Sequence, residues 1–315
     1  MNPGSPPRHH RPGRVPAVSV PGSTVPDMIQ ARSLLARPWV IWAVCVMVYV
    51  PSVPASIRGL GGPAGSADAL LPGASVESQF AAAATFSVLQ IAAAASATAL
   101  LLLGPAWGSD PVGERGRRLG LRWSNGRALI LGGAPGAAAG YVAILAGAGF
   151  VSALVLGGLH ITGRPTVGGS IPDPLLLAGD YLMSISAGIG EELLLLAIPF
   201  ALATRAGWKP WAVIVLLTGL RLSIHLYYGA GSVFVVLWIP AAYLLYRATG
   251  SIAPLMLGHI VYDLLATTVQ RSPALHTPAL VLLAGLAVLG SALLAGSASR
   301  YLTTGRRALP PLVGG

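Results

Sequence analysis

Long apolar runs alternate with short polar connections along the chain, and this pattern predicts a bundle of membrane-spanning helices. Apolar runs of about 18 residues or more are long enough to cross a bilayer as helices. Their Leu, Ala and Val residues are continuous and do not alternate with polar ones, which favours helices over a barrel. We predict eight spans, at 38–56, 79–103, 128–150, 174–204, 209–228, 232–248, 251–270 and 277–297. The predicted fold class is all-α, a polytopic integral membrane bundle.

The composition agrees with this prediction and indicates which kind of partner the protein contacts. The chain is 54% hydrophobic and 10% charged, whereas soluble domains are about 25% charged. Its net charge of +10 would suit nucleic acid, but the basic residues flank the apolar runs and form no patch with interleaved aromatic residues. We therefore expect the lipid bilayer as a partner, and no nucleic acid.

The basic residues also predict the orientation in the cell membrane. If the N-terminus is cytoplasmic, most of the 20 Lys and Arg residues fall in cytoplasmic segments, as the positive-inside rule requires. An even number of spans then makes both termini cytoplasmic. We divide the chain into a disordered basic cytoplasmic tail (1–37), helices one to three with their loops (38–173), a core (174–270), and the last helix with a basic cytoplasmic tail (271–315).

Ionisable residues occur inside only three predicted spans, the fourth, fifth and seventh. They are Asp180, Glu191, Glu192, Arg221, His225, His259 and Asp263. Such side chains are expensive in hydrocarbon, usually face a bundle interior or a water-filled cavity, and mark function. We therefore expect one shared polar site. Because neighbouring helical residues point about 100° apart, Glu191 and Glu192 are expected to have different roles in it.

Helical spacing groups the remaining residues in pairs. His259 and Asp263 are four residues apart and share a helix face, so the carboxylate can hold the imidazole in one tautomer. Arg221 and His225 have the same spacing. His225 comes late in its span and His259 early in its own, so upright helices would leave the two at different depths. A common site requires the fifth helix to tilt or to sit low.

The order of these residues resembles the CPBP family, which comprises CAAX prenyl proteases and bacteriocin-processing (Abi) enzymes and contains intramembrane endopeptidases. The first family motif is Glu-Glu-x-x-x-Arg. Here Glu191 and Glu192 are present, but Leu196 stands where Arg is expected. The second is Phe-x-x-x-His, and here Arg221 takes the Phe position before His225.

The third motif, His-x-x-x-Asn/Asp, is matched by His259 and Asp263. The preceding stretch RATGS also resembles the family's approach to this motif. The resemblance covers about residues 174–270. It implies a catalytic core in that region and the hydrolysis of a peptide bond within the membrane.

The resemblance also implies a role for each residue. Glu191 would be the general base that takes a proton from water, and His225 would help to orient that water. His259, held by Asp263, would stabilise the tetrahedral oxyanion, whereas Glu192 would be structural and accept a nearby cation. This interpretation requires no cofactor. A zinc ion held by Glu191, His225 and His259 is the alternative, although the usual zinc-protease spacing His-Glu-x-x-His is absent.

The two departures from the motifs lead to a further hypothesis, that Arg221 compensates for Leu196. A buried Arg needs a carboxylate partner, and Glu192 is the natural candidate. The competing interpretation pairs Arg221 with Asp180, or extends it to the interface, and regards Leu196 as the sign of an inactive member.

We therefore predict an intramembrane endopeptidase that acts on a membrane-associated protein or peptide. The alternative is a non-catalytic member or a small transporter whose polar cluster binds a ligand or a proton. If the site is catalytic, Glu191, His225 and His259 should converge.

Overall fold

The structure of the chain is a computed structural model that describes residues 38–50, 75–103, 111–121, 133–158, 173–272 and 274–304. These residues form helices and turns, without a strand among them, and the all-α membrane bundle is confirmed. The predicted N-terminal tail, the end of the C-terminal tail and most of the predicted loops lie outside the described residues. The division into four regions and the orientation of the termini stay predictions.

The helices follow the predicted order, with several boundaries moved. A first helix, Pro38–Tyr49, ends in a 3-10 turn, η1. The other elements are α3 (Val76–Leu103), α4 (Val112–Arg118), α6 (Ala134–Gly158), α7 (Pro174–Glu191), η5 (Glu192–Ala197), α8 (Ile198–Arg205), α9 (Pro210–His225), η6 (Leu226–Ser232), α10 (Val233–Thr249), α11 (Ala253–Arg271) and α12 (His276–Thr304).

Four helical stretches among the described residues are long and apolar enough to cross a membrane, namely Val76–Leu103, Ala134–Leu156, Pro174–Arg205 and His276–Gly296. The first helix, α9 and α10 are shorter apolar helices. The 16 residues of α9 rise by about 24 Å, less than the hydrocarbon thickness of about 30 Å. The predicted number of eight spans therefore stays a prediction, while the multi-pass character agrees with the structure.

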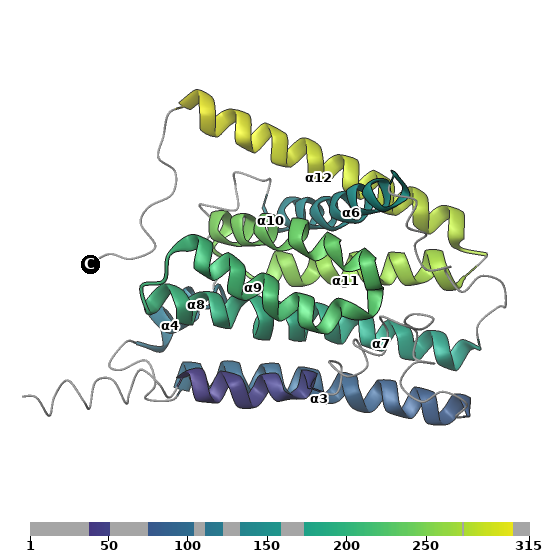
Figure 1. The fold of residues 1–315 in the computed structure, drawn as a ribbon, viewed down its shortest axis with the longest axis horizontal. Coiled ribbons are helices and arrows are strands. Elements are labelled where there is room, and N and C mark those ends of the chain that lie inside the picture. The colour runs from purple at the N-terminus through teal and green to yellow at the C-terminus, as the bar shows by residue number, and fades with distance from the viewer. Residues whose placement is uncertain are drawn as a thin grey trace, which may run out of the picture.

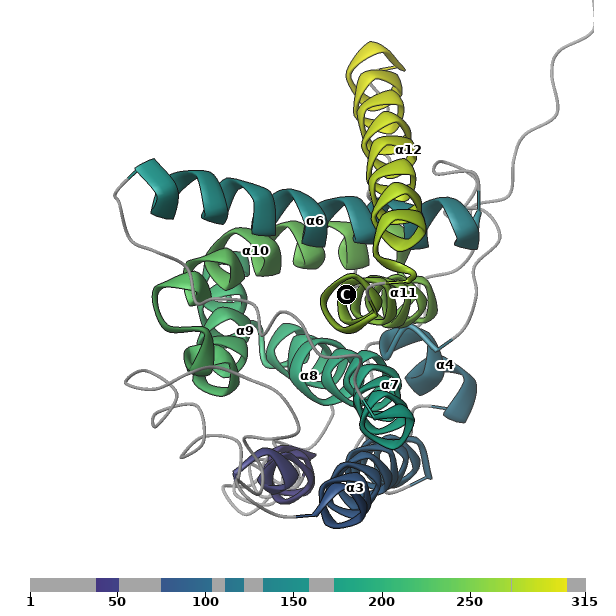
Figure 2. The same cartoon turned by 90° about the vertical axis from the view of Figure 1, so that its right-hand side faces the viewer.

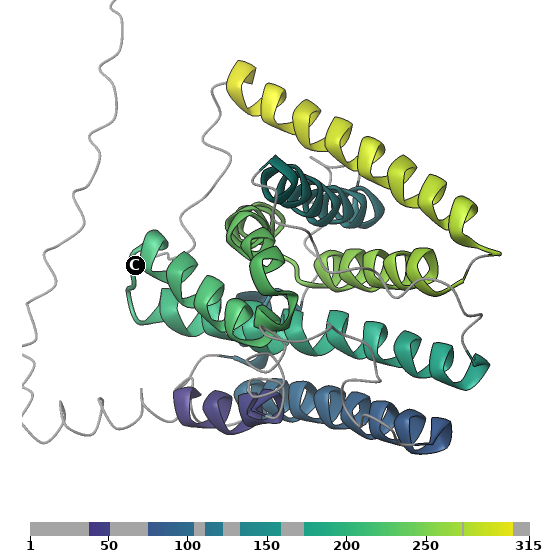
Figure 3. The same ribbon diagram turned by 45° about the vertical axis from the view of Figure 1, so that its right-hand side comes forward.

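The helices around α7 form the centre of the bundle. Helix α7 packs against α3 on one side and α11 on the other, and these three helices run horizontally in Figure 1 and are seen nearly end-on in Figure 2. Helix α6 crosses over α10 and α11, and α12 packs on the outer side of α6, as Figures 2 and 3 show. The first helix lies beside α3 (Figure 3).

A π-helical turn, η5, interrupts the continuous rod formed by α7 and α8. Its wide hydrogen-bond pattern pairs the N–H of Ile198 with the carbonyl of Leu193. The next bond of this pattern would join the Leu194 carbonyl to residue 199, which is a proline without an N–H. The indole of Trp42, on the first helix, donates to that carbonyl at 2.6 Å. The first helix therefore satisfies a backbone group that the π turn leaves without a helical partner.

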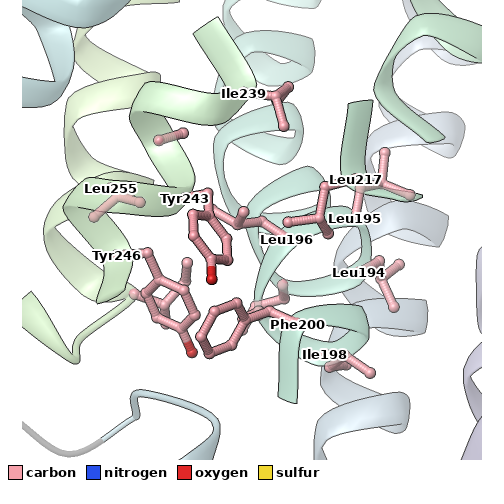
Figure 4. Packing of buried hydrophobic residues seen from close by; sticks show 14 of the residues in the cluster. Leu194, Leu195, Leu196, Ile198, Phe200, Leu217, Ile239, Tyr243, Tyr246 and Leu255 are labelled. Atoms are coloured by element: carbon pink, nitrogen blue, oxygen red, sulfur yellow. The ribbon is translucent and has the colours of Figure 1, made fainter. Parts of the chain in front are cut away.

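Apolar packing surrounds η5 and α8, as Figure 4 shows. The rings of Phe200 and Tyr246 meet edge to face with a centroid distance of 4.9 Å. The centroid of the Phe200 ring lies 5.5 Å from that of Tyr243. Leu196, the position where the CPBP motif has Arg, is fully buried in this apolar cluster.

Two glycines allow close packing of α11 with its neighbours. A Cβ atom at Gly258 would lie 2.6 Å from the Ala138 carbonyl oxygen on α6 and 2.9 Å from the Cβ of Tyr141. A Cβ atom at Gly188 of α7 would lie 2.9 Å from the backbone nitrogen of Ile260 on α11. Both contacts are shorter than the van der Waals separation, so the helices approach each other closely only because these positions are glycine.

We expect Gly258→Ala to destabilise the protein by about 1–3 kcal/mol, because the added methyl group forces backbone of α6 and α11 apart. The matched control is Gly219→Ala on α9, where an added Cβ meets nothing within 4 Å. Thermal unfolding in detergent measures both variants. Equal melting temperatures for Gly258→Ala and wild type would show that the approach of α6 is not tight.

Candidate active site

Two adjacent acids and one arginine form a buried ion-pair cluster at the junction of α7 and η5. Arg221 on α9 donates from Nη2 to Glu192 Oε1 at 2.7 Å, and from Nη1 to Glu191 Oε2. The side chains of Arg221 and Glu192 are 0% exposed, whereas that of Glu191 is 10% exposed. The planar guanidinium donates in a fork, so it can serve two carboxylates at once. Of these three side chains, only Glu191 retains exposed surface, and it is the acid that can meet a water molecule.

Glu192 is the centre of the hydrogen-bond network. Its Oε1 atom accepts from Arg221 Nη2 at 2.7 Å, from His259 Nδ1 at 2.7 Å and from the Tyr141 hydroxyl at 2.9 Å. The three donors come from α9, α11 and α6, so a single oxygen atom of η5 connects helices from three sides. Glu191 and Glu192 therefore share Arg221 but differ in their other surroundings, as the sequence predicts.

His259 lies between two carboxylates. Its Nδ1 atom is 2.7 Å from Glu192 Oε1, and its Nε2 atom is 3.3 Å from Asp263 Oδ2 on the same face of α11. Because ionised carboxylates only accept, both contacts are hydrogen bonds at once only when both ring nitrogens carry hydrogen. The side chain of Asp263 is 28% exposed, so this end of the network faces outward.

His225 is the last residue of α9, and the helix's own backbone orients its ring. Nδ1 lies 2.8 Å from the carbonyl oxygen of Arg221 one turn earlier, and it must therefore donate to that oxygen. When Nδ1 carries the proton of a neutral ring, Nε2 is the acceptor. The ring stacks on Tyr228 of η6 at a centroid distance of 5.8 Å.

Trp238 of α10 contacts both histidines. Its ring centroid is 5.9 Å from that of His225 and 5.4 Å from that of His259, with both imidazoles nearly perpendicular to the indole. Both histidines therefore contact one side chain, whereas straight, upright spans would leave them at different depths. Helix α9 is shorter than the predicted span 209–228 and ends at His225, so this histidine lies at the tip of a short helix beside the other site residues.

Asp180 does not belong to this cluster, and the expectation of one site for all the ionisable residues is wrong for this residue. Asp180 Oδ2 lies 3.2 Å from Arg271 Nε, an ion pair between the outer ends of α7 and α11. It is about 16 Å from Glu191 along the helix. The competing interpretation, in which Arg221 pairs with Asp180, is also wrong, because Arg221 pairs with the two glutamates.

The proposed zinc ligands do not form a metal site in this arrangement. Among the described residues, no group of three His, Cys, Asp or Glu side chains has the geometry to hold a metal ion. Arg221 engages a carboxylate oxygen of Glu191, and Nδ1 of His259 is directed at Glu192. Zinc coordination by Glu191, His225 and His259 would therefore require these contacts to rearrange.

The sequence analysis did not identify Tyr141 and Trp238 as site residues. Tyr141 is 0% exposed and Trp238 1% exposed, and both hydrogen-bond within the network. Each is an uncharged aromatic residue in an apolar run, and neither has a polar partner at helical spacing that would indicate a hydrogen bond. The available signal is weak: a buried hydroxyl or indole N–H needs a partner, and a carboxylate provides one.

These observations define a class, an all-α integral membrane protein with a buried acid–histidine site. Residues 173–265 match the family described as type II CAAX prenyl endopeptidase Rce1-like. The match assigns this part of the chain to the CAAX protease family and confirms the resemblance seen in the motifs. It covers less than half of the chain, and it includes α7 and most of α11 but not α6. No curated protein and no solved structure matches the chain.

The ion-pair cluster generates a prediction about Arg221. Arg221→Phe should destabilise the protein by about 3–5 kcal/mol, because it leaves two buried carboxylates without their cation. Adding Leu196→Arg should recover part of the loss, since residue 196 follows Glu192 by about one helical turn. Melting temperatures of the wild type, the single variant and the double variant measure the effect.

The control is Lys209→Ala, which removes an exposed cation at the start of the same helix. An Arg221→Phe protein as stable as Lys209→Ala would show that Arg221 does not hold the cluster. A double variant no more stable than Arg221→Phe would contradict the hypothesis that Arg221 replaces an arginine at position 196.

Proposed function

We propose that the protein is an intramembrane endopeptidase that hydrolyses a peptide bond of a membrane-associated protein or peptide. The observation that carries the proposal is the convergence of Glu191, His225 and His259 around Arg221 and Trp238, inside the segment that matches the protease family. A binding protein needs polar groups in its pocket. It does not need a slightly exposed acid beside one histidine that accepts a hydrogen bond and another that donates one.

In the proposed reaction, Glu191 is the general base. Arg221 engages its Oε2 atom, and we assign Oε1 to the attacking water. His225 Nε2 accepts a hydrogen bond from the second O–H group of that water and so orients the water oxygen toward the substrate. As Glu191 takes one proton, the oxygen attacks the carbonyl carbon of the peptide bond and a tetrahedral oxyanion forms.

His259 then stabilises the oxyanion through its Nε2–H group, which in the resting structure faces Asp263 at 3.3 Å. This separation is long for an N–H···O bond, so the N–H is available to donate to an oxygen on which negative charge develops. Glu191 returns its proton to the nitrogen of the leaving amine as the C–N bond breaks. The products are a carboxyl group and an amine, and Glu191 is regenerated. Arg221, which is fully buried, orients the two glutamates and does not touch the substrate.

One observation favours the alternative of a non-catalytic member or a small transporter. Arg221 already pairs with both Glu191 and Glu192, and a buried ion-pair network can be purely structural. The two functions differ in what the loss of one acid does. A protease loses its chemical step, whereas a structural network loses only stability.

We expect Glu191→Gln to reduce peptide cleavage by about 10³-fold or more, because an amide cannot take a proton from water. The assay uses the full chain in proteoliposomes and a library of internally quenched peptides, half of them with a C-terminal prenylated cysteine motif. The control is Asp180→Asn, which removes an acid of α7 that lies outside the cluster and should retain activity.

Equal cleavage by wild type and Glu191→Gln would remove Glu191 from the chemistry. If folded wild-type protein cleaves none of the peptides, while the thermal stability of Glu191→Gln differs from that of wild type, the non-catalytic alternative is favoured. A difference between the prenylated and unprenylated halves of the library identifies the substrate class.

We expect removal of metal ions to leave the activity unchanged, because in the proposed reaction an acid of the chain, Glu191, activates the water. Wild-type protein is incubated with 1,10-phenanthroline, dialysed and assayed with a cleaved peptide. A non-chelating phenanthroline isomer controls for effects on the bilayer. Loss of activity that returns on addition of zinc would replace this mechanism with one in which Glu191, His225 and His259 bind the metal.

A further inference from the structure

A buried hydrogen-bond chain leads from α10 through α6 to the central carboxylate. The indole Nε1 of Trp238 donates to the Tyr141 hydroxyl at 2.9 Å, and that hydroxyl donates to Glu192 Oε1 at 2.9 Å. All three side chains are excluded from the surface, with exposed fractions of 1%, 0% and 0%. Because burial of an unpaired polar group is costly, the indole N–H of Trp238 and the hydroxyl of Tyr141 are each stabilised by the partner that the chain provides.

The hydrogen bonds run in one direction, from Trp238 through Tyr141 to Glu192. An indole N–H can only donate, so the oxygen of Tyr141 must accept from Trp238. The single hydroxyl hydrogen of Tyr141 is then free to point at Glu192, which must accept. Tyr141 thus serves as an oriented donor, and phenylalanine at this position would keep the ring but lose both bonds.

The same aromatic pair contacts Arg221 and both histidines as well as Glu192. The Arg221 guanidinium carbon lies 4.7 Å from the centroid of the Trp238 ring, within the range of a cation–π interaction. The Trp238 ring is perpendicular to both His225 and His259, and the Tyr141 ring lies edge-on to His259 at 6.3 Å. Trp238 and Tyr141 therefore form an aromatic surface against which these groups pack.

The position of Tyr141 depends on the approach of α6 to α11. A Cβ at Gly258 would lie 2.9 Å from the Cβ of Tyr141, so the glycine directly before His259 makes room for this residue. Tyr141 lies outside the segment 173–265 that matches the protease family. The network at Glu192 is thus completed by a helix that the family match does not include.

We propose that Tyr141, oriented by Trp238, is a positioning residue: it fixes Glu192 Oε1 so that Glu192 holds Nδ1 of His259 and directs Nε2 of His259 toward the reacting carbonyl. The proposal rests on the proposed protease function. It adds to that function a donor from α6 that acts through Glu192 and touches no substrate, because Tyr141 is completely buried.

The test compares Tyr141→Phe with Tyr243→Phe, a matched control that removes the hydroxyl of a buried tyrosine packed on Phe200. Loss of a hydrogen bond to a charged group should lower kcat by about 10- to 100-fold, and KM should not change. Tyr243→Phe should leave both constants as in wild type.

The second measurement does not require a substrate. In protein with ¹⁵N-labelled histidine, the ring resonances of His259, assigned by their absence from His259→Gln, should shift in Tyr141→Phe and stay in place in Tyr243→Phe. Unchanged His259 resonances in Tyr141→Phe would overturn the proposal, even with a lower melting temperature, since a residue that only packs would give that result.

The two measurements separate this proposal from the proposed function. Absence of cleavage by folded wild-type protein would end the protease assignment, while the resonances would still decide whether Tyr141 positions His259. An inactive Glu191→Gln together with wild-type kcat for Tyr141→Phe would leave the protease function intact and reject the role of Tyr141.

Discussion

The ion pairs between Arg221 and the two glutamates are the interaction on which the site depends. Each of these charges alone would be costly inside the bundle, and each is tolerated because the others are present. Arg221 comes from α9 and the acids from the α7–η5 junction, so the charge requirement forces the two elements together. The donors on Glu192 then bring α6 and α11 to the same point. Electrostatics and helix packing thus specify the same arrangement.

A π turn begins at the second of the two glutamates that share Arg221. In a regular α-helix, adjacent side chains diverge by about 100°, yet both carboxylates reach one guanidinium here. The wider turn begins at Glu192, and such turns are frequent at functional sites. Its backbone cost is reduced by Trp42, which donates to the Leu194 carbonyl that Pro199 leaves unpaired. A residue of the first helix therefore supports the geometry of the acids from outside the segment that matches the family.

Much of the fold and part of the site could be predicted from the sequence. The long fourth span, predicted at 174–204, appears as Pro174–Arg205, because a long apolar run has no other stable state in lipid. The contact of His259 with Asp263 follows from a spacing of four residues on one helix. Asp180 was assigned to the wrong group, because a helical stripe gives direction but not distance, and its partner Arg271 lies just beyond the end of a predicted span.

The contributions of Tyr141 and Trp238 could not be predicted, for a different reason. Their bonds connect residues 97 positions apart in one case and 51 in the other, and neither has a charge to mark it within an apolar run. The end of α9 at His225 was also missed, because the apolar pattern continues into η6. Sequence periodicity locates helices and their faces, whereas these contacts depend on which helices cross.

The division of labour between the two glutamates follows from the number of donors around each. Three side chains donate to Oε1 of Glu192, and the side chain, including the unpartnered Oε2, is completely buried, so water does not reach it. Among the described residues, Glu191 receives a hydrogen bond from Arg221 alone and keeps part of its side chain exposed. A general base must hold an unsatisfied oxygen where water can reach it. Burying one acid completely and leaving its neighbour partly exposed restricts the base to Glu191. Because Glu192 also pairs with Arg221, Glu191 does not carry this buried cation alone and can act as the base.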